Sequence, residues 1–154
     1  MASQFNGRCD CGAVVYDLAA PPLFVHTCHC LDCKRKSGSA FAMTTIILER
    51  DFTLQSGALD VVTPKPGRTE RVCAACRQYL VRTSVARPHT ALLNTRTLDD
   101  SRCLTIGAHI WTKRKHPSLL IPPNEPQFEG NDYDRDATWP AESLARLRAV
   151  MGGA

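Results

Sequence analysis

Seven of the eight cysteines in this chain fall into three short clusters whose spacing suits metal ligation. Cys9 and Cys11 form the first cluster, the stretch CHCLDC at residues 28–33 holds the next three, and CAAC at residues 73–76 holds the last two. Thiolates are good zinc ligands, and a closely spaced cysteine pair commonly supplies half of a tetrahedral site. Cys103 stands alone, and we expect it to be a small buried hydrophobic residue.

Spacing alone leaves open how the clusters combine. Cys9 and Cys11 can join Cys73 and Cys76 in a closed four-cysteine site, which leaves 28, 30 and 33 as a three-cysteine site with an open ligand position. Alternatively, two of the central three cysteines close on Cys73 and Cys76. We favour the first combination because it uses all seven clustered cysteines. A closed site stabilises a fold, whereas an open position receives water or a substrate.

Other chemistries for the central cluster fit less well. His26 or His29 is an alternative fourth ligand, since imidazole also binds zinc, although a histidine between two ligands is more often a bystander. Iron–sulfur proteins use different cysteine spacings. A thioredoxin-like pair at Cys30 and Cys33 would need a βαβ pattern, which the sequence lacks.

Positive charge is concentrated in two runs, Lys34-Arg35-Lys36 and Lys113-Arg114-Lys115, in a chain of net charge +4. Such runs are usually solvated surface, and they can also provide a local field for a small anion. Runs of three are short for nucleic-acid binding, and the chain has no classical zinc-finger spacing or RNA-recognition signature. We therefore expect a small-molecule partner rather than a nucleic acid.

The elements that must position these cysteines are predicted to be mainly short strands. Short apolar stretches alternate with turn signals at residues 12–18, 41–48, 59–63, 79–85, 91–95, 104–111 and 119–121. One helix is expected from Pro140 to the Gly152-Gly153 stop, with an apolar packing stripe of Leu144, Leu147, Val150 and Met151. The 154 residues suit a single domain. No membrane-spanning run or signal peptide is evident, so we expect a soluble cytoplasmic protein with metal-binding cysteines rather than disulfides.

Three segments in order carry a resemblance to a known family. They are C-x-C-G-x-V-x-Y from Cys9 to Tyr16, C-H-C-x-x-C-x-x-x-S-G-S-A-F from Cys28 to Phe41, and the later C-x-x-C. Together they resemble the glutathione-dependent formaldehyde-activating enzyme family, which includes the domain of centromere protein V. Weaker similarity at Leu98-Asp99-Asp100, His109-Ile110-Trp111 and Pro126-Gln127-Phe128 extends the resemblance over about residues 6–130. One departure is Arg77, where the family usually has glycine.

The resemblance implies a β-tent-like domain of short antiparallel sheets, which we place at residues 1–154 with a helical extension at 136–154. It implies a structural zinc on Cys9, Cys11, Cys73 and Cys76, and a second zinc on Cys28, Cys30 and Cys33, where glutathione chemistry is proposed. The implied activity is a carbon–sulfur lyase that forms or cleaves an S-hydroxymethyl glutathione adduct. The alternative is a non-catalytic zinc-stabilised binding module or glutathione carrier.

Glutathione is negatively charged, so Lys34, Lys36 and Arg114 are candidate residues for binding it. The sequence identifies no general acid or base and predicts no oligomeric state.

Overall fold

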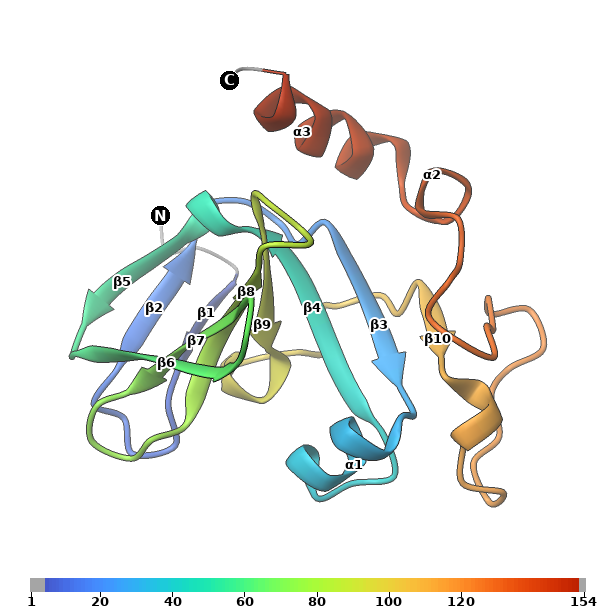
Figure 1. Ribbon diagram of the computed structural model, residues 1–154, viewed down its shortest axis with the longest axis horizontal. Coiled ribbons are helices and arrows are strands. Elements are labelled where there is room, and N and C mark those ends of the chain that lie inside the picture. Colours follow the sequence, from blue (N-terminus) through green and yellow to red (C-terminus); the bar gives the residue numbers. More distant parts are fainter. Residues whose placement is uncertain (1–4, 153–154) are drawn as a thin grey trace.

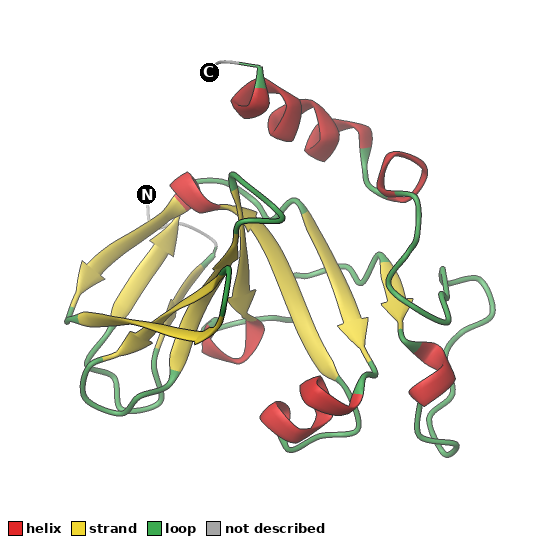
Figure 2. Ribbon diagram, in the orientation of Figure 1, coloured by secondary structure: helices red, strands yellow, loops and turns green. Residues whose placement is uncertain are grey.

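The computed structural model describes residues 5–152, which form a mainly β domain of two sheets with a C-terminal helix (Figures 1 and 2). The smaller sheet has the strand order β1-β2-β5, and the larger has the order β10-β3-β4-β9-β8-β7-β6. The strands are β1 (Asn6–Arg8), β2 (Val15–Leu18), β3 (Phe24–Cys28), β4 (Ala42–Leu48), β5 (Phe52–Ser56), β6 (Leu59–Lys65), β7 (Arg68–Cys73), β8 (Tyr79–Ser84), β9 (Thr90–Asn94) and β10 (Ala108–Ile110). The predicted fold class is confirmed.

All but one of the strand pairs are antiparallel. Short connections require this for neighbours such as β6 and β7. The exception is β10, which pairs parallel with β3 and places Ile110 opposite Cys28. The prediction of short antiparallel sheets did not include this pair, because β10 and β3 are far apart in sequence. Of the strand predicted at 104–111, only the residues of β10 form a strand, and the stretch 119–121 is not a strand.

Side chains from both sheets meet in a first core cluster. Its members are buried and mostly apolar: Cys9, Val14, Tyr16, Leu18, Ile47, Phe52, Cys73, Leu80, Val81, Ala91, Leu93 and Leu98. Tyr16 lies at the centre, stacked on Phe52 at 4.9 Å between ring centroids and hydrogen-bonded to the Thr97 hydroxyl at 2.8 Å. Two cysteines of the first and last clusters are therefore part of the core itself.

The helices lie at opposite ends of β3 and β4 (Figure 1). At one end, β3 is followed closely by α1 (Leu31–Ser37), a helix that the sequence does not predict and that carries the first basic run. At the other end lie α2 (Arg135–Thr138) and α3 (Ala141–Met151). Three short 3-10 turns, η1 (Glu49–Asp51), η2 (Thr95–Thr97) and η3 (Thr112–Arg114), complete the described elements.

The C-terminal helix packs against the large sheet through a second core cluster. Leu144 and Leu147 are buried there, and Trp139 stacks on Phe24 at 5.3 Å. Arg146 fixes the helix further by donating to the Asp51 carboxylate at 2.9 Å. The predicted apolar stripe is thus a packing face, although Met151 at its end is half exposed. Helix α3 ends before Gly152, and residues 153–154 of the predicted extension lie outside the described residues.

The structure also bears on the expected position of Cys103 and on the expected lack of a membrane span. Cys103 is exposed, not buried as predicted, because it lies in an irregular segment between η2 and β10. Among residues 5–152, no helix has the length and apolar character that a membrane span requires.

Candidate metal centres and the adjoining cavity

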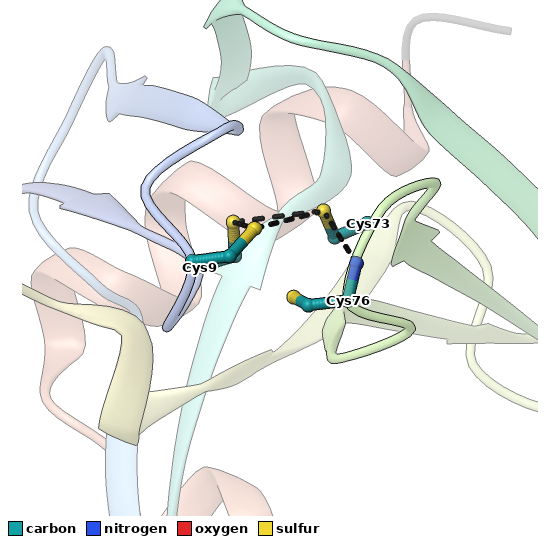
Figure 3. A group of neighbouring side chains, drawn as sticks. Cys9, Cys73 and Cys76 are labelled. Atoms are coloured by element: carbon teal, nitrogen blue, oxygen red, sulfur yellow. Dashed lines mark hydrogen bonds between the residues drawn. The ribbon is translucent and has the colours of Figure 1, made fainter.

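Two separate segments bring Cys9, Cys11, Cys73 and Cys76 together, one after β1 and the other at the end of β7 (Figure 3). Their four Sγ atoms all lie within 4.8 Å of one another. The Sγ of Cys9 is 3.3 Å from that of Cys11 and 3.6 Å from that of Cys73, and Cys11 and Cys73 are 3.8 Å apart. Zinc–sulfur bonds of about 2.3 Å in a tetrahedron put sulfurs about 3.8 Å apart, so this spacing fits a zinc ion.

Backbone turns hold each cysteine pair. In the first loop, the N–H of Val14 donates to the Cys9 Sγ at 3.2 Å, and Gly12 has a φ of 75°. In the second, the N–H of Cys76 donates to the Cys73 Sγ at 3.5 Å. The N–H of Asp10 then donates to the Gln78 side chain at 2.7 Å, which joins the two loops. Backbone hydrogen bonds therefore hold each cysteine pair in place without the help of a metal ion.

Arg77 follows the second pair in a backbone conformation that glycine adopts more easily. Its φ is 64°, and its N–H closes the turn on the Cys73 carbonyl at 3.0 Å. Left-handed geometry costs a residue with a Cβ atom about 1 to 2 kcal/mol, which is the physical reason to expect glycine in this turn. The Arg77 guanidinium forms an ion pair with Asp60 on β6. The turn thus closes on Cys73 with an arginine in the left-handed conformation.

Crowding of the four thiols changes their acidity. Burial opposes ionisation of Cys9, but the Val14 N–H and the neighbouring thiols lower its pKa to about 7. The N–H of Ala13 favours the Cys11 thiolate, yet the thiols of Cys9 and Cys76 outweigh it and raise the Cys11 pKa to about 12. One thiolate thus forms readily and suppresses ionisation of its neighbour. A dication removes this conflict by neutralising the shared negative charge.

The three remaining clustered cysteines form a second group at the junction of β3 and α1. The Sγ atoms of Cys28, Cys30 and Cys33 lie within 4.8 Å of one another. Cys28 is the last residue of β3, Cys30 is the N-cap of α1, and Cys33 lies in the first turn of the helix. The Cys33 N–H donates to the Cys30 Sγ at 3.4 Å. A strand end followed at once by a helix start therefore folds three nearby cysteines onto one point.

The acidity of this group favours thiolate formation at Cys33. The hydrogen bond with the Cys28 thiol is the main cause, and it lowers the Cys33 pKa to about 6 in spite of burial. The same pairing raises the pKa of Cys28. The positive charge of Arg82 favours the Cys33 thiolate further.

A cavity of about 590 Å³ opens beside the second group and not beside the first. Cys28, Cys30 and Cys33 line it, together with residues of β3, β4, β8 and β9 in the large sheet. Six basic side chains contribute to the lining, and they are Lys36, Lys65, Arg68, Arg82, Arg87 and Arg96. The acidic lining residue is Asp32. The cavity is large enough for a molecule of drug size and favours an anionic one.

Comparison with known proteins shows which family this chain belongs to. The sequence model of the family described as "Glutathione-dependent formaldehyde-activating enzyme" matches residues 4–114. The chain belongs to this family. A Rhodobacter sphaeroides protein of known crystal structure is similar in fold, with a TM-score of 0.50 and 18% sequence identity over 80% of this chain and 98% of that one. None of the curated protein sequences matches this chain.

Family membership supports glutathione as the small-molecule thiol partner. The cavity beside the three-cysteine group is the candidate place for it to bind. Of the residues predicted to bind glutathione, Lys36 lines the cavity. Lys34 instead donates to the Arg114 carbonyl at 2.7 Å, and neither of these two residues is in the lining. A contact of Lys34 or Arg114 with glutathione therefore stays a prediction.

The histidines considered as fourth ligands are not part of the three-cysteine group. Among the described residues, the group of ligand atoms at this site consists of the three cysteine Sγ atoms and includes no ring nitrogen of His26 or His29. His29 Nε2 lies 3.3 Å from the Thr27 hydroxyl, which in turn bonds to His109 Nδ1 at 2.6 Å. His109 Nε2 completes this buried network at the Glu125 carboxylate, 2.5 Å away. The network ties the CHC segment to β10 and to the chain that follows it.

Sequence reasoning missed the charged lining that comes from β8 and its following turn. Arg82 lies on β8 and Arg87 lies between β8 and β9, and both line the cavity. Each is isolated in the sequence, so neither belongs to a charge run. Strand alternation does not single out Arg82 either, because the consecutive β8 residues Arg82, Thr83 and Ser84 all line the cavity.

Proposed function

We propose that this protein is a zinc-dependent carbon–sulfur lyase of the glutathione and formaldehyde type. In this proposal Cys28, Cys30 and Cys33 hold a zinc ion with one open ligand position. The cavity binds glutathione so that its sulfur reaches that position. Cys9, Cys11, Cys73 and Cys76 hold a second, structural zinc that stabilises the fold.

The observation that carries the proposal is the coincidence of an incomplete ligand set with a cavity. Three sulfurs leave a tetrahedral metal one ligand short, and the same three residues line a space of about 590 Å³. The four-cysteine group has a full set of donors, and none of its members lines this cavity. A protein that needed zinc only for folding would have no use for the second arrangement.

A zinc ion at the three-cysteine group would supply positive charge and a vacant ligand position that favours a thiolate at neutral pH. The chain's own residues prepare the surroundings. Cys30 and Cys33 are fixed by the first turn of α1, and Arg82 places positive charge beside Cys33. Lys36, on the same helix, lines the cavity within 3.4 Å of the Glu70 carboxylate. These cations offset the negative charge that another thiolate brings.

The overall reaction is an addition without oxidation or reduction. The glutathione sulfur forms a bond to the carbonyl carbon of formaldehyde, and the carbonyl double bond becomes a single bond to oxygen. The proton that leaves the thiol is balanced by the proton gained at that oxygen. The reverse reaction breaks the same carbon–sulfur bond. Holding the two reactants in one cavity raises their effective concentration, which is the expected source of acceleration.

Binding experiments test the sulfur contact. Glutathione should bind the zinc-loaded protein with release of a proton, measured by calorimetry in buffers of different ionisation enthalpy. S-methylglutathione, whose sulfur forms no thiolate, should bind much more weakly. Equal affinity for the two ligands would overturn the sulfur contact.

An exchange experiment then separates the lyase from the glutathione carrier. Nuclear magnetic resonance with carbon-13 formaldehyde reports the rate at which the S-hydroxymethyl adduct forms and breaks down. A lyase accelerates this exchange, and Cys33→Ala should abolish the acceleration while Cys103→Ala, at an exposed site outside both groups, retains it. Binding of glutathione without any acceleration would favour the carrier.

A further inference from the structure

A row of polar side chains crosses the cavity beside the three-cysteine group. His26 on β3, Thr44 on β4 and Asn94 on β9 are register partners, and all three line the cavity. His26 is two residues before Cys28 on one strand, so the two side chains share a face at a spacing of about 7 Å. The row therefore lies one step along the strand from the proposed sulfur position.

His26 differs from the rest of this row because a buried ring nitrogen has no hydrogen-bond partner within residues 5–152. Its side chain is 5% exposed, and Nδ1 is buried without a hydrogen-bond partner among the described residues. A buried polar atom left without a partner costs about 1 to 3 kcal/mol, so such atoms are rare unless a ligand completes them. Nδ1 itself is closed off from the cavity, whereas Nε2 is not among these fully buried atoms and has no hydrogen-bond partner among the described residues either. Because His26 lines the cavity, a bound molecule can bond to the ring through Nε2.

Arg87 supplies the charge that selects the kind of molecule. It lines the same cavity, and its positive charge acts on the His26 ring. Four other lining cations are paired with carboxylates: Lys36 and Arg82 with Glu70, Lys65 with Asp32, and Arg96 with Asp10. Arg68 and Arg87, in contrast, have no ion pair within the described part of the chain, and of these two Arg87 is the one whose charge acts on the His26 ring. A guanidinium without an ion pair that lines the same cavity as an imidazole ring is suited to a carboxylate.

We propose that His26 and Arg87 form a carboxylate subsite that recognises the glycine end of glutathione. The inference rests on the proposed function in one respect, since it assumes that the substrate sulfur lies at the three-cysteine group. The subsite needs a hydrogen-bond donor from His26, and the imidazole ring presents an N–H in either protonation state. Arg87 adds the opposite charge, and the exposed position of its side chain lets it close over a ligand.

The two carboxylates of glutathione differ in a way that favours the glycine end. The γ-glutamyl carboxylate has an ammonium group on the same carbon, and a lining rich in cations repels that ammonium. The glycine carboxylate has no such neighbour. An electrostatic preference for the glycine end follows from the charges alone.

Four ligands separate this inference from the proposed function. They are glutathione, its glycine ethyl ester, its γ-glutamyl ethyl ester, and S-methylglutathione, each titrated calorimetrically into the zinc-loaded protein. The two esters have the same net charge, so any difference between them reports on position and not on total charge. The S-methyl ligand tests the sulfur contact independently of either carboxylate.

We expect the glycine ester to bind roughly ten- to a hundredfold more weakly than glutathione, as the loss of a charge-assisted hydrogen bond predicts. The γ-glutamyl ester should lose less than about threefold. Equal weakening by both esters, or greater weakening by the γ-glutamyl ester, would overturn the subsite. If S-methylglutathione binds as well as glutathione, the proposed function fails, and the comparison of the two esters still decides the subsite.

Matched variants assign the effect to residues. Arg87→Gln should weaken glutathione about tenfold and leave the affinity of the glycine ester unchanged, since the ester has no charge for Arg87 to bind. Arg50→Gln removes a similar exposed cation from η1, outside the cavity, and should alter neither ligand. A loss for both ligands in Arg87→Gln would mean a general effect and would overturn the assignment.

His26→Leu distinguishes a ligand contact from a packing role. Replacing an unpartnered buried polar ring by an apolar side chain should preserve or raise the melting temperature, because no hydrogen bond is lost. The same variant should nevertheless lose the preference for glutathione over its glycine ester. A stable variant that keeps the full preference would exclude His26 from the subsite. If His26→Leu does not fold, His26→Gln, which retains a donor, should keep the preference, and its loss there would count against the contact.

Discussion

The two cysteine groups use the same ligand chemistry in opposite structural settings. The four-cysteine group joins two loops whose cysteines Cys9 and Cys73 are 64 residues apart, and both of these side chains are buried in the first core cluster. The three-cysteine group is contained in residues 28–33, at a single strand–helix junction beside the cavity. The first group closes the tertiary structure, whereas the second is complete locally and open toward a ligand.

The comparison teaches how much stability each group can contribute. A site whose ligands come from distant segments exists only in the folded chain, so its metal-binding energy stabilises the fold. A site within a few residues also survives in the unfolded chain, and binding to the unfolded state reduces the stabilisation. A zinc–sulfur bond in the four-cysteine group would therefore stabilise the fold more than one in the three-cysteine group.

The largest expected difference comes from removing a cysteine of the four-cysteine group. Cys73→Ala deletes one of the four ligands of a site that forms only in the folded chain, and a quarter of the binding free energy of a structural zinc is about 3 kcal/mol. We expect the variant to lose at least this free energy of unfolding or to fail to fold, measured by denaturant titration. Cys103→Ala, exposed and outside both groups, should stay within about 0.5 kcal/mol of the parent. An unchanged midpoint for Cys73→Ala would reverse the roles assigned to the two groups.

Alanine substitutions at two glycines, one beside each cysteine group, test how tightly the two regions are packed. Gly57 has a φ of +87°, and an added Cβ would lie 2.2 Å from the Ala13 carbonyl oxygen in the first cysteine loop. Gly38 caps α1 with a φ of +63° and has no heavy atom within 4 Å of an added Cβ. Gly57→Ala should cost about 3 kcal/mol of folding free energy, and Gly38→Ala about 1 kcal/mol. Similar thermal shifts for the two variants would refute the contrast in packing.

Removing a ligand of the three-cysteine group should affect metal content more than stability. We expect two zinc ions per chain in the parent and one in Cys30→Ala, counted by elemental analysis with thiols kept reduced. The fold should lose only about 1 kcal/mol, because Cys30 also caps α1 by accepting from the Cys33 N–H. A variant that unfolds, or a parent that holds a single zinc, would contradict this expectation.

The smallest expected effect concerns pH and the core beside the four-cysteine group. Burial raises the pKa of Tyr16 above its ordinary value of 10, so the folded chain keeps a proton that the unfolded chain releases. Stability is then full below pH 10 and falls as pH rises, by about 1 kcal/mol between pH 10 and pH 11. Tyr16→Phe should lose less stability over this interval, with Tyr133→Phe as the partly buried control. Parallel pH profiles for parent and Tyr16→Phe would contradict the assignment.

The sequence predicted the cysteine grouping better than it predicted the elements that produce it. Thiols at fixed short spacings leave few combinations, and the combination that used all seven clustered cysteines is the one that the structure assembles. Ligation of a metal by these groups stays a prediction. In contrast, β3 was missed because all five of its residues are buried, which removes the alternation of polar and apolar residues that marks a half-buried strand.

Helix α1 was missed for a related reason. It has seven residues and no buried side chain, so no apolar stripe marks it in the sequence. Its start is instead set by Cys30, a residue that would be read first as a metal ligand and not as a helix cap. Arg87 could not be assigned from the sequence either, because it follows β8 while His26 lies on β3, and the two line one cavity only in the folded chain.

The local character of the three-cysteine group has a consequence for the order of events during synthesis. Residues 28–33 leave the ribosome with all three ligands present, whereas Cys9 and Cys11 must wait for Cys73 and Cys76 to emerge. The nascent chain can thus acquire metal at the open group first, while the sheet that will surround it is still incomplete. A chain stalled between these points would display reactive thiols or an exposed metal, so prompt completion of β7 and its turn protects the molecule.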